Sequence, residues 1–105
     1  MDFQNYGQER ERIATESEIR IFEIIKELSG REDLRLVRKS DNYVTAAIGM
    51  TDVVRFKYTP RAKWVLFPYV YDDKIRVESP EDVYDMPDTI DKAVRMADEI
   101  NSSGN

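Results

Sequence analysis

The side chains that most enzymes use for catalysis are scarce in this sequence. It has no histidine, the commonest general base, and no cysteine, which removes the thiol nucleophile and the usual ligands of structural zinc. A serine–lysine pair at Lys39 and Ser40 is unsuitable, because adjacent residues of a strand point to opposite faces. The four glycines are scattered, so they cannot build a glycine-rich phosphate loop. We therefore predict that the protein is not an enzyme and has no cofactor.

Carboxylates are abundant and define the main alternative. Nucleases of the PD-(D/E)XK type place one acid ahead of an acid-x-Lys triplet, and the order of Asp41 or Asp52 before Arg55-Phe56-Lys57 resembles this pattern. Arginine stands where the second metal-binding acid belongs, and its cation would repel the metal. The resemblance therefore fails at a metal ligand, and we predict no metal site. A small carboxylate-based, metal-dependent hydrolase or nuclease is kept as the alternative function.

The other acidic residues suit simpler roles. Asp72 and Asp73 are expected in a hairpin turn. Acids that follow Ser79 are expected near a helix N-terminus, where they favour the helix dipole (Glu81, Asp82, Asp85, Asp88). Acids of the first predicted helix alternate with basic residues, which is typical of a solvated surface rather than a mimic of DNA phosphates. An acidic inhibitor of a nucleic-acid-binding protein is the second alternative.

Charge is unevenly distributed along the chain. Residues 34–66 carry seven basic and two acidic side chains, whereas residues 1–33 have a balance of −4 and residues 67–105 a balance of −6. The net charge of −5 weighs against attraction of the whole molecule to DNA or anionic lipid. It still leaves a local basic face available to an anion.

Length and composition suit a single domain. We expect one α+β domain over the 105 residues, with flexible tails at 1–7 and 102–105. No run of about 18 apolar residues is present, so we predict no membrane association. The first five residues lack the basic start and apolar stretch of a secretory signal. Together with the absence of cysteine, this predicts a cytoplasmic protein.

A helix is predicted over residues 8–29. Apolar residues recur at three- and four-residue intervals and form one buried stripe (Ile21, Ile24, Ile25, Leu28). Thr15 and Glu18 match a capping box, which would begin the stable part of the helix at that point. Gly30 is placed for a left-handed C-cap.

Five strands are expected after this helix, joined by short polar connections as in an antiparallel meander. They cover residues 34–39, 43–48, 53–58, 63–69 and 74–78. Pro68 indicates a bulge, an edge or the end of the fourth strand. Ser79 begins a helical turn that Pro87 stops, and Asp88 then caps a C-terminal helix. The predicted fold is a two-layer α+β fold with both helices on one face of the sheet.

Alternation of residue types assigns the two faces of the sheet. A loop from Thr59 to Ala62 places Phe56 opposite Val65 on the core face and Lys57 opposite Trp64 on the other face. A three-residue loop at 50–52 would place Arg55 beside Ala47 and Phe56 beside Ala46. The open face then carries the seven residues that we predict as a binding surface (Tyr43, Arg35, Arg55, Lys57, Trp64, Leu66, Arg76).

Trp64 and Leu66 form an apolar centre within these cations, and three interpretations follow. In the first, the face is an ordinary solvated surface on which Lys57 makes a cation–π contact of about 0.5–1 kcal/mol with Trp64. In the second, it is an interface for a protein partner or a homodimer. In the third, it is a platform for single-stranded nucleic acid or another anion. We hypothesise a non-enzymatic binding or adaptor module that acts through this face, with a protein partner or homodimer as the first expectation.

Overall fold

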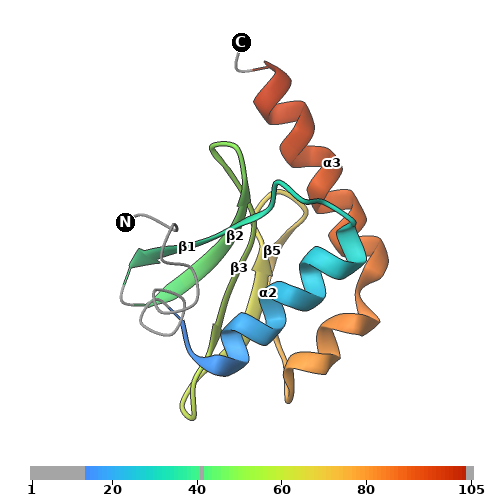
Figure 1. Cartoon of the computed structure of the whole chain (residues 1–105). Coiled ribbons are helices and arrows are strands. Elements are labelled where there is room, and N and C mark those ends of the chain that lie inside the picture. Colours follow the sequence, from blue (N-terminus) through green and yellow to red (C-terminus); the bar gives the residue numbers. More distant parts are fainter. Residues whose placement is uncertain (1–13, 41, 104–105) are drawn as a thin grey trace.

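The computed structural model describes residues 14–40 and 42–103. Helix α2 (Glu16–Ser29) precedes five strands, a short 3₁₀ helix and the C-terminal helix α3 (Figure 1). These elements are β1 (Arg35–Ser40), β2 (Tyr43–Ile48), β3 (Thr51–Tyr58), β4 (Lys63–Phe67), β5 (Tyr71–Arg76), η2 (Pro80–Asp85) and α3 (Pro87–Ser103). Each strand pairs antiparallel with its neighbour in sequence. The predicted five-stranded meander is therefore confirmed.

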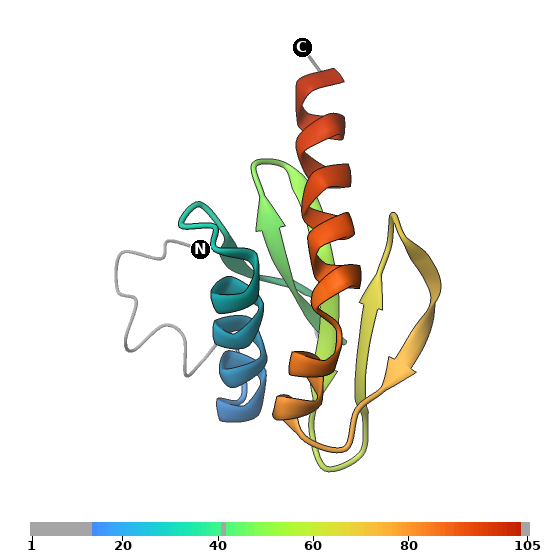
Figure 2. The same ribbon diagram turned by 90° about the vertical axis from the view of Figure 1, so that its right-hand side faces the viewer.

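Both helices cover the same face of the sheet, as the two perpendicular views show (Figures 1 and 2). Helices α2 and α3 pack against each other and against β3. No helix of the described part of the chain covers the other face. The two-layer α+β architecture is confirmed, and the helix-free face is the one that sequence alternation left open.

The core lies between the helices and the sheet. Apolar side chains of α2 meet the inward residues of the strands, and Phe56 and Phe67 are completely buried. Helix α3 contributes a matching stripe (Ile90, Ala93, Val94, Ala97). Each fully buried large apolar side chain stabilises the fold by about 1.5–3 kcal/mol. This core fixes the sheet and thereby the side chains on its opposite face.

The start of α2 is tied to the end of β3. Thr15 and Glu18 form the predicted capping box, in which each side chain accepts a hydrogen bond from the backbone N–H of the other. The second carboxylate oxygen of Glu18 accepts the backbone N–H of Tyr58 at 2.8 Å, and the Thr15 hydroxyl donates to the Tyr58 carbonyl at 2.9 Å. Gly30 ends the helix with φ of 67°, as predicted.

Several predicted boundaries were wrong or fall outside the described residues. Asp72 and Asp73 lie within β5 rather than in a turn, because Pro68 cannot donate to the ladder and the chain turns at once after Phe67. Residues 1–13 and 104–105, which include the predicted N-terminal tail and the first part of the predicted helix, lie outside the described residues, as does residue 41. Helix α3 continues to Ser103, into the predicted C-terminal tail.

The C-terminal helix begins differently from the prediction. Pro87 is its first residue rather than the end of the preceding turn, and Asp88 lies inside the first turn instead of capping it. The fixed φ of proline and its missing N–H suit this first helical position. The turn that precedes α3 has its own capping box between Ser79 and Asp82.

The strand registers were predicted correctly at one hairpin and wrongly at the next. Phe56 lies opposite Val65 and Lys57 opposite Trp64, as predicted. Between β2 and β3, however, Phe56 pairs with Val44 instead of Ala46, so the predicted register was wrong by two residues. Because side-chain direction repeats every two residues, the predicted faces were still correct. The hairpin loop is shorter than predicted, since Thr51 already pairs with Ile48.

A bulge near the start of β3 also changes which residues face outward. Ala46 pairs with Val54 but Ala47 pairs with Asp52, which leaves Val53 as the extra residue. Asp52 therefore lies on the same face as Arg55 and Lys57, whereas strict alternation would have placed it toward the helices.

Candidate ligand-binding hollow on the open sheet face

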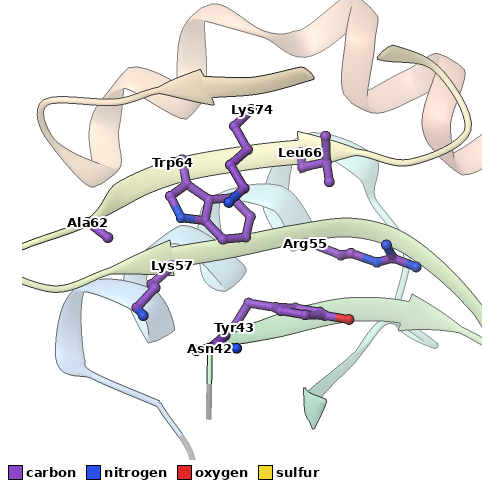
Figure 3. Close-up of a pocket in the computed structure, with 8 residues that line it drawn as sticks. All are labelled: Asn42, Tyr43, Arg55, Lys57, Ala62, Trp64, Leu66 and Lys74. Carbon is purple, nitrogen blue, oxygen red and sulfur yellow. The ribbon is translucent and has the colours of Figure 1, made fainter. Parts of the chain in front are cut away.

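A hollow of about 430 Å³ lies on the helix-free face of the sheet (Figure 3). We call it the sheet-face hollow. Its described lining includes three cations and two aromatic rings but no carboxylate. The lining residues are Asn42, Tyr43, Arg55, Lys57, Ala62, Trp64, Leu66 and Lys74. Five of the seven residues predicted from sequence thus lie together, and three further residues join them.

Four neighbouring strands supply this lining because outward residues of paired strands lie side by side. Arg55 is opposite Leu66 and Lys57 is opposite Trp64 in the β3–β4 pair. Tyr43 enters from the start of β2, on the other side of β3 (Figure 3). The antiparallel meander therefore brings together side chains that are more than 20 positions apart in the sequence.

The two aromatic rings approach each other across β3. The ring centroids of Tyr43 and Trp64 are 6.3 Å apart, and the ring planes are inclined by 51°. This is within the separation at which aromatic side chains interact. The rings consequently form two inclined apolar surfaces above the cations of the central strand.

Cations lie against both rings. The Lys74 ammonium is 4.4 Å from the centroid of Trp64, and the Arg55 guanidinium is 5.7 Å from that of Tyr43. The contact that we predicted between Lys57 and Trp64 is replaced by the one from Lys74. Figure 3 shows Lys57 directed away from the indole, whereas Lys74 reaches over it from β5. Lys74 begins the predicted strand 74–78, but it was not among the seven residues predicted as the binding surface.

Asp52 holds one side of this face together. Its carboxylate accepts a hydrogen bond from Arg55 Nε at 3.0 Å and forms an ion pair with Lys39 at 3.6 Å. Only 9% of the Asp52 side chain is exposed, so this pair is shielded from solvent on the Asp52 side. Lys57 and Lys74 have no ion-pair partner among the described residues, and their charges are therefore available to a ligand.

Two of the predicted residues do not line the hollow. Arg35 on β1 donates to the carbonyl of Gly49 in the β2–β3 loop. Arg76 is opposite Trp64 in the β4–β5 register, yet its side chain pairs with Glu78 at 2.9 Å, and both groups are largely exposed. Each cation is thus directed toward an internal acceptor instead of the aromatic rings.

A second hollow beside the end of α3 has a structural explanation. Arg31 donates to Asp98 at 2.7 Å and to Asp33, and these hydrogen bonds raise the pKa of its guanidinium. Asn101 donates to the Ile48 carbonyl at 2.9 Å, while its side-chain oxygen accepts from Thr51. These groups satisfy one another and clamp α3 to the β2–β3 hairpin.

The described residues contain neither a metal-binding cluster nor a membrane-spanning helix. In the ranges 14–40 and 42–103, no three acidic side chains converge in a way that would hold a metal ion. Within the same ranges, no helix combines the length and the apolar character needed to cross a membrane.

Comparison with known proteins identifies no relative. No protein-family model matches this sequence, and no match was found among curated proteins or solved structures. Function must therefore be inferred from the chemistry of the sheet-face hollow.

Proposed function

We propose that this protein is a non-enzymatic binding module, and that its sheet-face hollow receives an anionic partner in the cytoplasm. The observation that carries the proposal is the composition of the lining. Arg55, Lys57 and Lys74 surround the rings of Tyr43 and Trp64, and no carboxylate of the described residues lines the hollow. Among the described residues, two of these cations have no ion-pair partner. An anion can therefore be bound without first breaking a salt bridge of the fold.

The acidic net charge of the chain does not oppose local binding of an anion. Exposed carboxylates of α2 and α3 belong to the layer on the opposite side of the sheet (Glu16, Glu23, Glu27, Asp88, Asp91, Glu99). The molecule extends over 37 × 30 × 23 Å, whereas screening at physiological salt acts over about 8 Å. Asp72 and Asp73 share β5 with Lys74 but do not line the hollow, so a ligand there is influenced more by the lining cations than by the acids of the helix layer.

The same cations disfavour a symmetric homodimer through this face. A twofold interface brings the same patch of both copies together. Arg55, Lys57 and Lys74 would then approach an identical set of cations, and juxtaposed like charges oppose association. We therefore favour a partner of opposite charge over the homodimer that the sequence also suggested.

Binding can be followed without a label, because Trp64 is the sole tryptophan and it lies in the hollow. We would titrate the protein at low salt with a mixed-sequence oligonucleotide, an oligoglutamate peptide and inorganic tripolyphosphate. At least one of these anions is expected to produce a saturable change in the fluorescence of Trp64.

Paired charge reversals test whether the response comes from the hollow. Lys57→Glu combined with Lys74→Glu should abolish it. The matched control reverses Lys92 and Arg95, which are exposed on α3, and it changes the net charge by the same amount. An absence of response to all three anions, or an equal loss in both double variants, would refute the proposed function.

A further inference from the structure

We infer that the anionic partner is single-stranded nucleic acid, with bases stacked on Trp64 and Tyr43 and phosphates bound by Lys57 and Lys74. This inference rests on the proposed function and specifies its ligand. Aromatic side chains combined with a positively charged groove are the features by which proteins bind single strands without sequence preference.

The aromatic pair separates this ligand from an acidic peptide. A peptide carboxylate needs only the cations, and it gains little from two inclined rings whose centroids are 6.3 Å apart. A nucleotide uses both parts of the site, since every base has a flat π surface and every linkage carries a phosphate. A hollow of about 430 Å³ lies within the range of about 300–1,000 Å³ that is usual for ligand sites.

The cations are distributed in a way that suits a strand of nucleotides. Arg55 and Lys57 are successive outward residues of β3, so their backbones are about 7 Å apart. Lys74 comes from β5 and its ammonium lies over the ring of Trp64, so a base stacks on this ring once the ammonium has moved aside toward a phosphate (Figure 3). The phosphate on each side of a stacked base would therefore lie close to one of these cations. Asp52 positions Arg55 beside Tyr43 and also limits the charge of that cation.

The shape of the surface favours a single strand over a duplex. Base pairing and stacking in a duplex hide the flat surfaces of the bases and leave only their edges in the grooves. The major groove admits a helix or a two-stranded ribbon, which are both narrower than this five-stranded sheet. The rings of the hollow can therefore stack only on bases that are already unpaired.

The first experiment compares ligands. The anisotropy of a fluorescein-labelled, mixed-sequence 15-nucleotide strand of DNA or RNA would be measured at low salt. Binding is expected, and unlabelled single strand should compete with it, whereas duplex of the same sequence and oligoglutamate of the same charge should compete at least tenfold less well. The logarithm of affinity should fall with the logarithm of salt with a slope of roughly −1.4 to −2, as expected for two or three phosphate contacts.

The second experiment tests stacking. Trp64→Leu and Tyr43→Leu remove a ring and keep an apolar side chain, and each should weaken binding by about 5- to 150-fold. Trp64→Phe keeps a ring and should remain within a few fold of the unaltered protein. Thermal unfolding followed by circular dichroism establishes that each variant is folded, and a variant that is unfolded at the assay temperature would be replaced by Trp64→Met.

The outcomes separate this inference from the proposed function. Equal competition by oligoglutamate, or unchanged affinity in the folded Trp64→Leu variant, would overturn the nucleic-acid assignment while the anion-binding module stands. Equal competition by duplex would also overturn it, since it would show binding through phosphates alone. Binding of tripolyphosphate or oligoglutamate without any binding of single strands would have the same meaning. If no anion binds, both proposals fail.

Discussion

Glu18 is the side chain whose removal most directly tests the account of how the helix layer is attached to the sheet. It is only 1% exposed. One carboxylate oxygen accepts the backbone N–H of Thr15 at 2.9 Å, and the other accepts that of Tyr58 at 2.8 Å. Arg38 lies 3.6 Å from the first of these oxygens. We expect Glu18→Ala to destabilise the protein substantially.

The magnitude follows from the groups left unpaired. Loss of a helix N-cap interaction costs about 0.5–2 kcal/mol. A buried backbone donor that loses its acceptor costs about 1–3 kcal/mol, and this applies to the N–H of Tyr58. Since water can reach part of this region, we expect a loss of about 2–4 kcal/mol in the free energy of unfolding. A domain of this kind has only about 5–15 kcal/mol in total. Glu18→Gln should cost about 1–3 kcal/mol, because its amide group presents a donor to one of the two backbone N–H groups.

The assay is urea unfolding followed by the fluorescence of Trp64. The midpoint should fall while the dependence on urea concentration stays constant, which identifies a change in stability alone. Glu16→Ala is the matched control, because Glu16 is exposed in the first turn of the same helix. Its loss should not exceed about 1 kcal/mol, the usual size of a helix-dipole interaction. If Glu18→Ala costs no more than Glu16→Ala, Glu18 does not join α2 to β3 in the way described.

Two further predictions concern the core and the turn before α3. Phe56 is completely buried, so Phe56→Ala should reduce the free energy of unfolding by about 3–5 kcal/mol in the same assay. The control is Met50→Ala, at a side chain that is 94% exposed, which should change the free energy of unfolding by no more than about 0.5 kcal/mol. A loss below about 1 kcal/mol for Phe56→Ala would show that the face assignment is inverted. Backbone hydrogen bonds from Glu78 and Ser79 lower the pKa of Asp82 in the folded protein. The ionised carboxylate therefore stabilises the fold fully at pH values above its unfolded pKa of about 3.9. This stabilisation is lost as the pH falls through the lower pKa of the folded state. Asp82→Ala should accordingly lower the urea midpoint more at pH 7 than at pH 2, and a difference that persists unchanged at pH 2 would contradict this reasoning.

Local patterns in the sequence were sufficient wherever the structure depends on neighbouring residues. Thr15 and Glu18 begin α2 and Gly30 ends it, because capping depends on residue types three positions apart and on a single positive φ. The β3–β4 hairpin was correct for the same reason, since its short turn fixes the register of both strands. Five residues of the hollow could be placed on one face from alternation alone.

Other features were decided by the assembled sheet. The bulge at Val53 places Asp52 on the open face, where it pairs with Arg55. The residue types at these positions do not indicate a bulge. Lys74 was expected at the beginning of the fifth strand, but the earlier turn at Pro68 places it within β5. It then reaches Trp64, which the sequence had assigned to Lys57.

The site itself therefore has two origins. The sequence determined that cations and aromatic residues share one face of an antiparallel sheet, because side-chain direction alternates along each strand regardless of the rest of the fold. Only the tertiary structure decided which of them meet. Tyr43 and Trp64 belong to strands that are not neighbours, and their rings meet over β3 because the observed β2–β3 register, two residues from the predicted one, brings the start of β2 level with Trp64.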